Sequence, residues 1–356
     1  MQILVVQTAF LGDVVMTTPL LRELRRVHPD SRLTVLTTRT GREALSNFPH
    51  VDRLLVLDKR WRVSGLRSFA RLAWLLRSES FDIAIAAQRS SRTGQLLWIS
   101  GAPLRVGFEG AAGAWAYHQQ IPWNGESHAV RRYLDLSSAV GGDPAEANPR
   151  PELAIDSTAD ARMARLLVDE GLHEGQPFVC VAPGSRRATK RWTRAGFAKV
   201  ISAATAEGLP AVLVGTTSER DLCVRLAAES SSGAVVTAGR TGVRDLIALV
   251  ARASVVLAND SGTAHVASAV GTPVVSVFGP TSPADGRTPF GSIHRIVERG
   301  NLDCRPCGTH GHRFCPRLHF RCMREIDPAE VSARLLEFSP RRAQSPAGGG
   351  SSNCRR

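Results

Sequence analysis

The sequence lacks any uninterrupted apolar run near the roughly 18 residues that a membrane-spanning helix requires, so contact with a membrane would have to be peripheral. It also lacks the charged and apolar regions of a signal peptide at its start, because residues 3–6 already read as a buried strand. We therefore expect a cytoplasmic protein. Lysine is scarce, yet 45 basic residues face 32 acidic ones and give a net charge of +13. This excess suggests an anionic partner.

Three common signatures are missing as well. The loop after the first strand has no Gly-Lys-Ser/Thr ending and is not a P-loop. No Asp-x-Asp occurs, so the usual carboxylate pair for a metal-bridged diphosphate is absent, and we expect neither a catalytic metal nor a cofactor. Charge on a leaving diphosphate would be balanced by basic side chains and helix amino termini. Interleaved aromatics or a recognition motif for nucleic acid are also lacking, so we predict no nucleic-acid partner.

What the sequence does contain is two series of short apolar, β-branched runs that alternate with helical patterns. Such alternation is typical of a parallel sheet covered on both faces. Two series predict two doubly wound α/β domains, with a site in the cleft between them at the carboxyl ends of the strands. The predicted strands are residues 3–6, 33–36, 54–57 and 83–87, then 178–181, 211–215, 235–238, 255–258 and 274–278.

The position of the domain junction is predicted from glycine and proline residues, which interrupt helices and strands. Residues 141–177 hold the densest Gly and Pro dipeptides within the folded part, which favours a boundary there. We expect one domain over residues 1–150 and a second over residues 151–338. Residues 339–356 are rich in Pro, Gly and Ser and are predicted to be a disordered tail.

The loop after the first strand carries a candidate carboxylate. Gly12 permits a tight turn, and Asp13 opens a helix that runs to about Val27. An aspartate at this place either caps the helix or points into the cleft, and capping is the commoner role.

The second half contains three candidate anion-binding loops, each after a predicted strand. Backbone amides, a hydroxyl and several cations at a helix entrance suit a diphosphate, although a solvated basic loop or a helix cap would leave the same pattern. The residues are Ser185, Thr189 and Lys190 in the first loop, Glu219 in the second, and Asp260, Ser261, Gly262, Thr263 and His265 in the third.

The order of residues 11–22, LGDVVMTTPLLR, closely resembles the amino-terminal signature of the ADP-heptose:lipopolysaccharide heptosyltransferase family, glycosyltransferase family 9. The Asp-x-Gly-x-x-His spacing from Asp260 to His265 resembles that family's nucleotide-sugar motif, and residues 128–134 are a further match. The similarity spans about residues 1–338 and is nearest to heptosyltransferase II-like members.

The resemblance implies a GT-B type fold, in which two Rossmann-like domains face a central cleft. It also implies that Asp13 is the general base, that the first domain binds the acceptor, and that the second binds ADP-heptose through the loop residues named above. The implied reaction is an inverting, metal-independent transfer of heptose to the lipid A-Kdo acceptor, at the inner face of the inner membrane. A transferase or epimerase of the same architecture acting on another nucleotide sugar remains the first alternative. A basic, non-catalytic nucleic-acid-binding protein, suggested only by the net charge, is the second and less favoured one.

Two further features are weaker indications. Arginines crowd the first half, where Arg60, Arg62, Arg89 and Arg92 are candidates for binding an acidic acceptor and the helix predicted over residues 66–77 could rest on anionic headgroups. A packed surface helix with a solvated basic face is the alternative. In the second half Cys304, Cys307, Cys315 and Cys322 have a spacing compatible with a small structural zinc site, or with ordinary free thiols.

Overall fold

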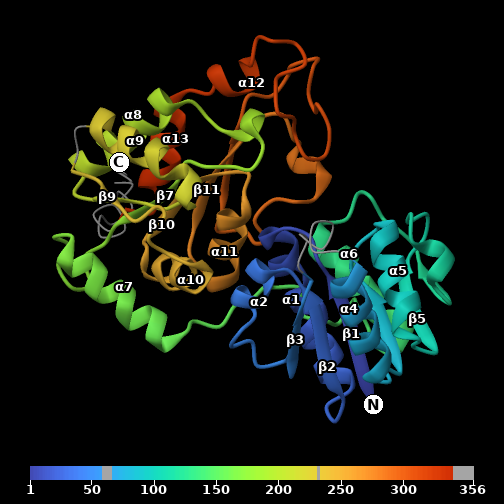
Figure 1. The fold of residues 1–356 in the computed structure, drawn as a ribbon. Coiled ribbons are helices and arrows are strands. Elements are labelled where there is room, and N and C mark those ends of the chain that lie inside the picture. The colour runs from blue at the N-terminus through green and yellow to red at the C-terminus, as the bar shows by residue number, and fades with distance from the viewer. Residues whose placement is uncertain (58–65, 231–232, 340–356) are drawn as a thin grey trace, which may run out of the picture.

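The computed structural model describes residues 1–57, 66–230 and 233–339. It contains two six-stranded sheets, one in each half of the chain, with helices on both faces of each sheet (Figure 1). The sheets lie side by side, and the chain crosses from one to the other between β6 and β7. We call the two halves the first and second lobes.

The first sheet has the order β3-β2-β1-β4-β5-β6, with every strand parallel to its neighbours. Its central strands are buried on both faces, as their continuous apolar sequences predict. The strands are β1 (Gln2–Gln7), β2 (Arg32–Thr37), β3 (Arg53–Val56), β4 (Ile83–Ala86), β5 (Leu104–Phe108) and β6 (Gln119–Ile121).

Helices cover the first sheet in two layers. Alternate strand residues pack either with α1, α2 and α6 or with α4, α5 and η1, so that Ile3 and Val5 belong to one apolar cluster and Leu4 and Val6 to another. The bounds are α1 (Leu11–Val27), α2 (Arg39–Ala44), α4 (Leu66–Ser78), α5 (Ser91–Ser100), η1 (Ala114–Ala116), α6 (Ala129–Asp135) and η2 (Leu136–Val140).

The second sheet has the order β12-β11-β10-β7-β8-β9 and is also parallel throughout. Its strands are β7 (Val179–Ala182), β8 (Ala211–Leu213), β9 (Val235–Val236), β10 (Val255–Asn259), β11 (Val274–Phe278) and β12 (Arg295–Glu298). Its helical elements are α7 (Ser157–Asp169), η3 (Ala188–Lys190), α8 (Arg194–Ala206), η4 (Thr217–Glu219), α9 (Arg220–Ser230), α10 (Val243–Arg252), α11 (Gly262–Val270), η5 (Pro283–Asp285), α12 (Arg321–Arg324) and α13 (Pro328–Leu336).

The prediction of two doubly wound α/β lobes is confirmed. All nine predicted strands form, within one or two residues at each end. Three strands escaped prediction, namely β5, β6 and β12, because they are short or carry polar residues such as Arg105, Gln119 and Arg295. The domain limits at residues 150 and 338 stay a prediction, and the tail beyond Ser339 lies outside the described residues.

The lobes meet along helices and share an apolar core. One cluster of buried side chains runs from α1 through α11 and α10 to the second sheet. Helix α1 approaches α11 so closely that a Cβ on Gly12 would lie 2.5 Å from His265 Cδ2, and a Cβ on Gly262 would lie 3.1 Å from Leu11 Cβ. Small residues are therefore needed where the two helix starts meet.

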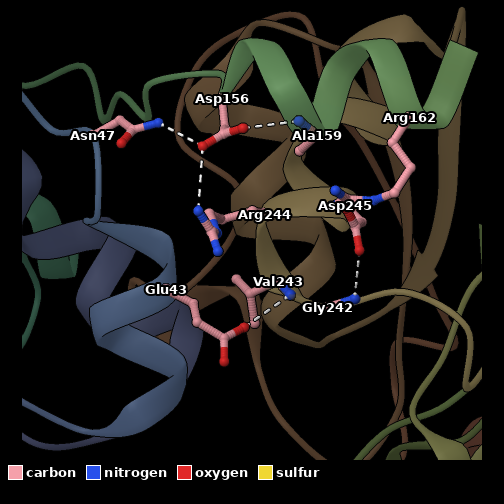
Figure 2. A network of polar contacts seen from close by, with 9 residues as sticks. All are labelled: Glu43, Asn47, Asp156, Ala159, Arg162, Gly242, Val243, Arg244 and Asp245. Carbon is pink, nitrogen blue, oxygen red and sulfur yellow. Dashed lines mark hydrogen bonds and ion pairs between the residues drawn. The ribbon is translucent and has the colours of Figure 1, made fainter.

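A polar network also joins the lobes beside α10 (Figure 2). Glu43, on α2, accepts a hydrogen bond from the Val243 amide at the start of α10, at 3.1 Å. Asp156 caps α7 through the Ala159 amide, at 2.8 Å, and also accepts a hydrogen bond from Asn47, at 2.9 Å. The network thus ties α2 and the segment that follows it in the first lobe to α10 and α7 of the second.

None of the helices in the described residues is long and apolar enough to cross a membrane.

Candidate functional site

A cavity of about 750 Å³ opens between the lobes. Its lining comes from loops at the carboxyl ends of the strands β1, β2, β7, β8, β10 and β11, which is where ligands bind in open α/β sheets. The volume falls in the range of small-molecule sites. Nearly all the predicted catalytic and donor-binding residues line it, namely Asp13, Ser185, Lys190, Glu219, Asp260, Ser261, Gly262, Thr263 and His265.

Asp13 lies in the first turn of α1 and both lines the cavity and caps its helix. Its Oδ2 is 3.4 Å from the Phe10 amide, a long capping bond. Its Oδ1 accepts a hydrogen bond of 3.1 Å from the Tyr133 hydroxyl on α6. Because the cap is long and the carboxylate is only half-buried, Asp13 remains open to a ligand in the cavity.

Tyr133 was not singled out from the sequence, although residues 128–134 were noted as a family match. Burial and the neighbouring Asp13 carboxylate raise the pKa of Tyr133 far above its ordinary value. The hydroxyl therefore stays protonated and donates to Asp13. A contact between residues 120 positions apart leaves no local signal in the sequence.

The start of α11 presents a second polar surface to the cavity. Ser261 precedes the helix, and its Oγ is buried without a hydrogen-bond partner in the described structure. Gly262 and Thr263, also in the lining, begin the helix, so backbone amides with no intrahelical partner face the same space. Helix starts attract anions, and here the starts of α1 and α11 converge.

Lys190 and Asp260 form an ion pair of 2.5 Å within the lining. The Thr281 hydroxyl donates to the same Asp260 oxygen at 2.7 Å. Asn259 fixes the loop that carries Lys190, since its side chain accepts from the Trp192 amide at 2.9 Å and donates to the Pro183 carbonyl at 2.8 Å. The cation is thus held beside the start of α11.

His265 is a buried imidazole at the contact between the lobes. Burial lowers its pKa to about 4, against a smaller opposing effect of the Asp260 and Asp13 carboxylates. The ring is therefore neutral near pH 7.

Of the two remaining residues predicted to bind the nucleotide sugar, Glu219 lines the cavity and Thr189 does not. Glu219 caps η4, accepting from the Thr216 amide at 2.8 Å, and still lines the cavity beside Gly184. Both alternatives considered for it are therefore compatible with its position. Thr189 is not in the lining, because its hydroxyl is bonded to the His312 backbone at 2.8 Å. Thr189 instead anchors the segment from Cys304 to Cys322, which we call the cysteine-rich loop.

The two predicted acceptor arginines that the structure describes, Arg89 and Arg92, lie apart from the cavity lining. The Arg89 guanidinium stacks over the Trp123 ring at 4.6 Å and donates to the Gly110 carbonyl at 3.0 Å. Arg92 is half-buried near the start of α5. Arg60 and Arg62 lie outside the described residues.

Arg186, one of the cations of the first candidate anion-binding loop, lines the cavity and stacks on the Phe10 ring at 4.2 Å, so that it bridges the two lobes. Other lining residues were missed by sequence reasoning. Arg287 contacts His310 Nδ1 at 3.1 Å. Asp285 has a buried Oδ2 without a partner in the described structure. Asp285 ends η5 and Arg287 follows it, where no motif marks them, and only the tertiary fold brings them to the cavity.

The cysteine-rich loop reaches the cavity through Thr309 and His310. All four of its cysteines are free thiols, and Cys304 Sγ lies 3.8 Å from His319 Nε2. Among the described residues no group of three or more potential metal ligands is arranged to hold an ion. Burial raises the pKa of Cys322 to about 11, so that thiol is protonated near pH 7.

Two Rossmann-like lobes that face a ligand-sized cavity define a GT-B type fold. The family model of glycosyltransferase family 9 (heptosyltransferase) matches residues 69–316, and the chain belongs to this family.

Curated relatives and solved structures agree with this assignment. The chain is 28% identical over 290 residues to lipopolysaccharide heptosyltransferase 3 of Escherichia coli, covering 76% of this chain and 82% of the relative. It is 26% identical over 358 residues to lipopolysaccharide heptosyltransferase 1 of Pseudomonas aeruginosa, covering 94% and 97%. The solved structure of E. coli ADP-heptose lps heptosyltransferase II superimposes with a TM-score of 0.77 at 23% identity, covering 95% of this chain and 98% of that one.

Proposed function

We propose that this glycosyltransferase moves heptose from ADP-heptose to the inner core of lipopolysaccharide, with the lipid A-Kdo precursor as acceptor. The observation that carries the proposal is the meeting of a carboxylate from one lobe, Asp13, with the amide-rich start of α11 from the other, across one cavity. The curated relatives described above are lipopolysaccharide heptosyltransferases, which supports the choice of substrates.

The second lobe would hold the donor. Free amides at the start of α11, the Ser261 hydroxyl and Lys190 would bind the diphosphate, because each supplies a donor or positive charge to the cavity. Glu219, which follows β8, would accept hydrogen bonds from the ribose. No metal is required in this scheme, since Lys190 and the helix starts balance the charge that develops on the leaving ADP.

The first lobe would supply the base. Asp13 would take the proton of an acceptor hydroxyl while that oxygen forms a bond to the anomeric carbon of the heptose. The bond from that carbon to the diphosphate oxygen breaks on the opposite face, and its electron pair leaves with ADP. Attack opposite the leaving group inverts the anomeric configuration.

Replacement of Asp13 by Asn tests this assignment. The Asn oxygen can accept the bond from the Phe10 amide, and its NH2 group can donate to the Tyr133 hydroxyl oxygen once that hydroxyl turns its hydrogen away, so the fold should persist. We expect kcat to fall by roughly 10²- to 10⁴-fold while the Kd for ADP-heptose, measured by calorimetry, stays within about twofold. A fully active Asp13→Asn enzyme would contradict the proposal.

The donor is tested separately by thermal shift of the unmodified protein. ADP-heptose should raise the melting temperature more than UDP or GDP sugars do at equal concentration, because the stabilisation of the folded state grows with the ratio of ligand concentration to Kd. Stronger stabilisation by a UDP or GDP sugar would overturn the donor assignment and leave the family intact.

A further inference from the structure

Three large aromatic side chains are exposed on the outer layer of the first lobe. Trp74 on α4, Trp98 on α5 and Trp115 on η1 are 70%, 60% and 61% exposed. All three elements cover the same face of the first sheet, since their apolar side chains share one cluster. The tryptophans therefore lie on the outer side of one layer. We call this surface the tryptophan face.

Contacts between the elements hold the tryptophan face together. A Cβ on Gly101, which ends α5, would lie 2.7 Å from Arg77 Nη1 on α4. Trp74 and Trp98 each precede these contacting residues by three positions, about one helical turn, so they stand at similar levels on adjacent helices. At the other end of α5, Gly94 packs directly on Gly113, next to η1 and Trp115.

The charge of the tryptophan face is of one sign. Neither α4 nor α5 contains an acidic residue, and there is none between Asp82 and Glu109. Arg71 and Arg77 are exposed on α4. Beside Trp115, Arg105 is bonded to the Ala116 carbonyl at 2.7 Å and contacts His118 Nε2 at 2.8 Å.

We propose that the tryptophan face docks on an anionic lipid bilayer. Tryptophan is the side chain that favours the boundary between headgroups and acyl chains, because one end of its ring system is apolar and the other donates a hydrogen bond. Arginines beside it are attracted to anionic headgroups. Tryptophan and arginine are also enriched in protein interfaces, so the choice of a bilayer rests on the uniform positive charge and is decided by the vesicle test below. Docking would bring the enzyme to the membrane that holds the lipid-linked acceptor of the proposed function. Vesicle binding itself does not depend on that function.

The test is co-sedimentation of the full chain with phosphatidylcholine vesicles, with and without phosphatidylglycerol, in the absence of substrates. We expect the unmodified protein to bind the anionic vesicles, to dissociate from them at high salt, and not to bind the neutral vesicles. The triple variant Trp74→Ser, Trp98→Ser, Trp115→Ser should bind anionic vesicles at least about tenfold more weakly. Because these side chains are exposed, its melting temperature should match that of the unmodified protein.

The matched control is Ile155→Ser, Val168→Ser, which removes side chains 47% and 50% exposed on the second lobe. It should sediment like the unmodified protein. The proposal is overturned if the triple variant keeps its vesicle affinity, if both variants lose it equally, or if the unmodified protein does not bind anionic vesicles. It is also overturned if the unmodified protein is a dimer that the triple variant breaks, since a second copy would then occupy the face. Failure of the Asp13 assignment would leave every one of these outcomes unchanged.

Discussion

The Asp13 side chain caps the start of α1 and also lines the cavity between the lobes. Sequence reasoning set a helix cap against a role in the cleft as alternatives, and the structure satisfies both, because the capping bond to Phe10 is long and the second oxygen is held from another helix. The fixed geometry of the carboxylate thus depends on Tyr133. That dependence could not be predicted, since nothing within a few positions of Asp13 reports on a residue 120 positions away.

Replacing Tyr133 by Phe should therefore lower activity without weakening donor binding. The variant keeps the ring and loses the hydrogen bond that orients Asp13, which would cost roughly tenfold in kcat, or about 1.4 kcal/mol, from misplacement of the base. We expect the KM for ADP-heptose to stay within about twofold, because Tyr133 is not in the cavity lining. Steady-state kinetics with the donor varied at fixed acceptor would measure both quantities.

The chain offers a matched control for this prediction in its other tyrosine. Tyr117 is also buried, but its hydroxyl has no hydrogen-bond partner in the described structure, and it belongs to the opposite face of the first sheet. Tyr117→Phe should leave kcat unchanged. Equal losses in the two variants would mean that aromatic packing, and not the bond to Asp13, matters.

At the scale of elements, strand positions were predicted most accurately for the strands that are buried on both faces. The central strands of both sheets are continuous apolar runs, and their positions followed directly. Strands β6 and β12 are edge strands with one open side and β5 lies next to an edge, and residues such as Arg105 and Glu298 are only partly buried or exposed there. Their patterns therefore resemble loops. The helix start at α11 was predicted because glycine, hydroxyl and strand end occur together in eight residues, and its binding of an anion stays a prediction.

Helix α10 receives part of its amino-terminal cap from the other lobe, which no local sequence rule anticipates. Its own Asp245 bonds the Gly242 amide at 2.9 Å, and Glu43 from α2 bonds the Val243 amide (Figure 2). Replacing Glu43 by Ala should cost about 1 kcal/mol, the usual value of a lost cap. In hydrogen exchange, the first turn of α10 should open faster in Glu43→Ala.

Glu43→Gln separates the cap from the charge. The amide oxygen of Gln can still accept a hydrogen bond from Val243, so protection of the first turn should return to near that of the unmodified protein. If Gln behaves like Ala, the charge of Glu43 at the helix start is the stabilising factor, and the hydrogen bond is not.

At the scale of the whole molecule, the two lobes are joined through groups whose state depends on pH. His265 is buried against Gly12 of the first lobe, and His128 at the start of α6 bonds the Thr288 carbonyl of the second at 2.9 Å. Burial lowers the pKa of both. The sequence indicated a facing pair of lobes, but it could not indicate that neutral imidazoles lie in the contact between them, because burial of a single histidine depends on both partners.

This arrangement predicts a loss of stability in mild acid. A histidine whose pKa is lower in the folded than in the unfolded state binds more protons when unfolded, so stability falls as pH drops below the unfolded value of 6.5 and levels off only below the folded value, which is about 4 for His265. A shift of this size corresponds to as much as about 3 kcal/mol. Urea unfolding at several pH values between these limits should show the decline. It should be shallower in His265→Asn, which carries no titrating ring, and unchanged in His173→Asn, where the histidine is exposed. An identical decline in stability in all three proteins would mean that the acid sensitivity arises from other groups. His265 would then contribute only packing beside Gly12.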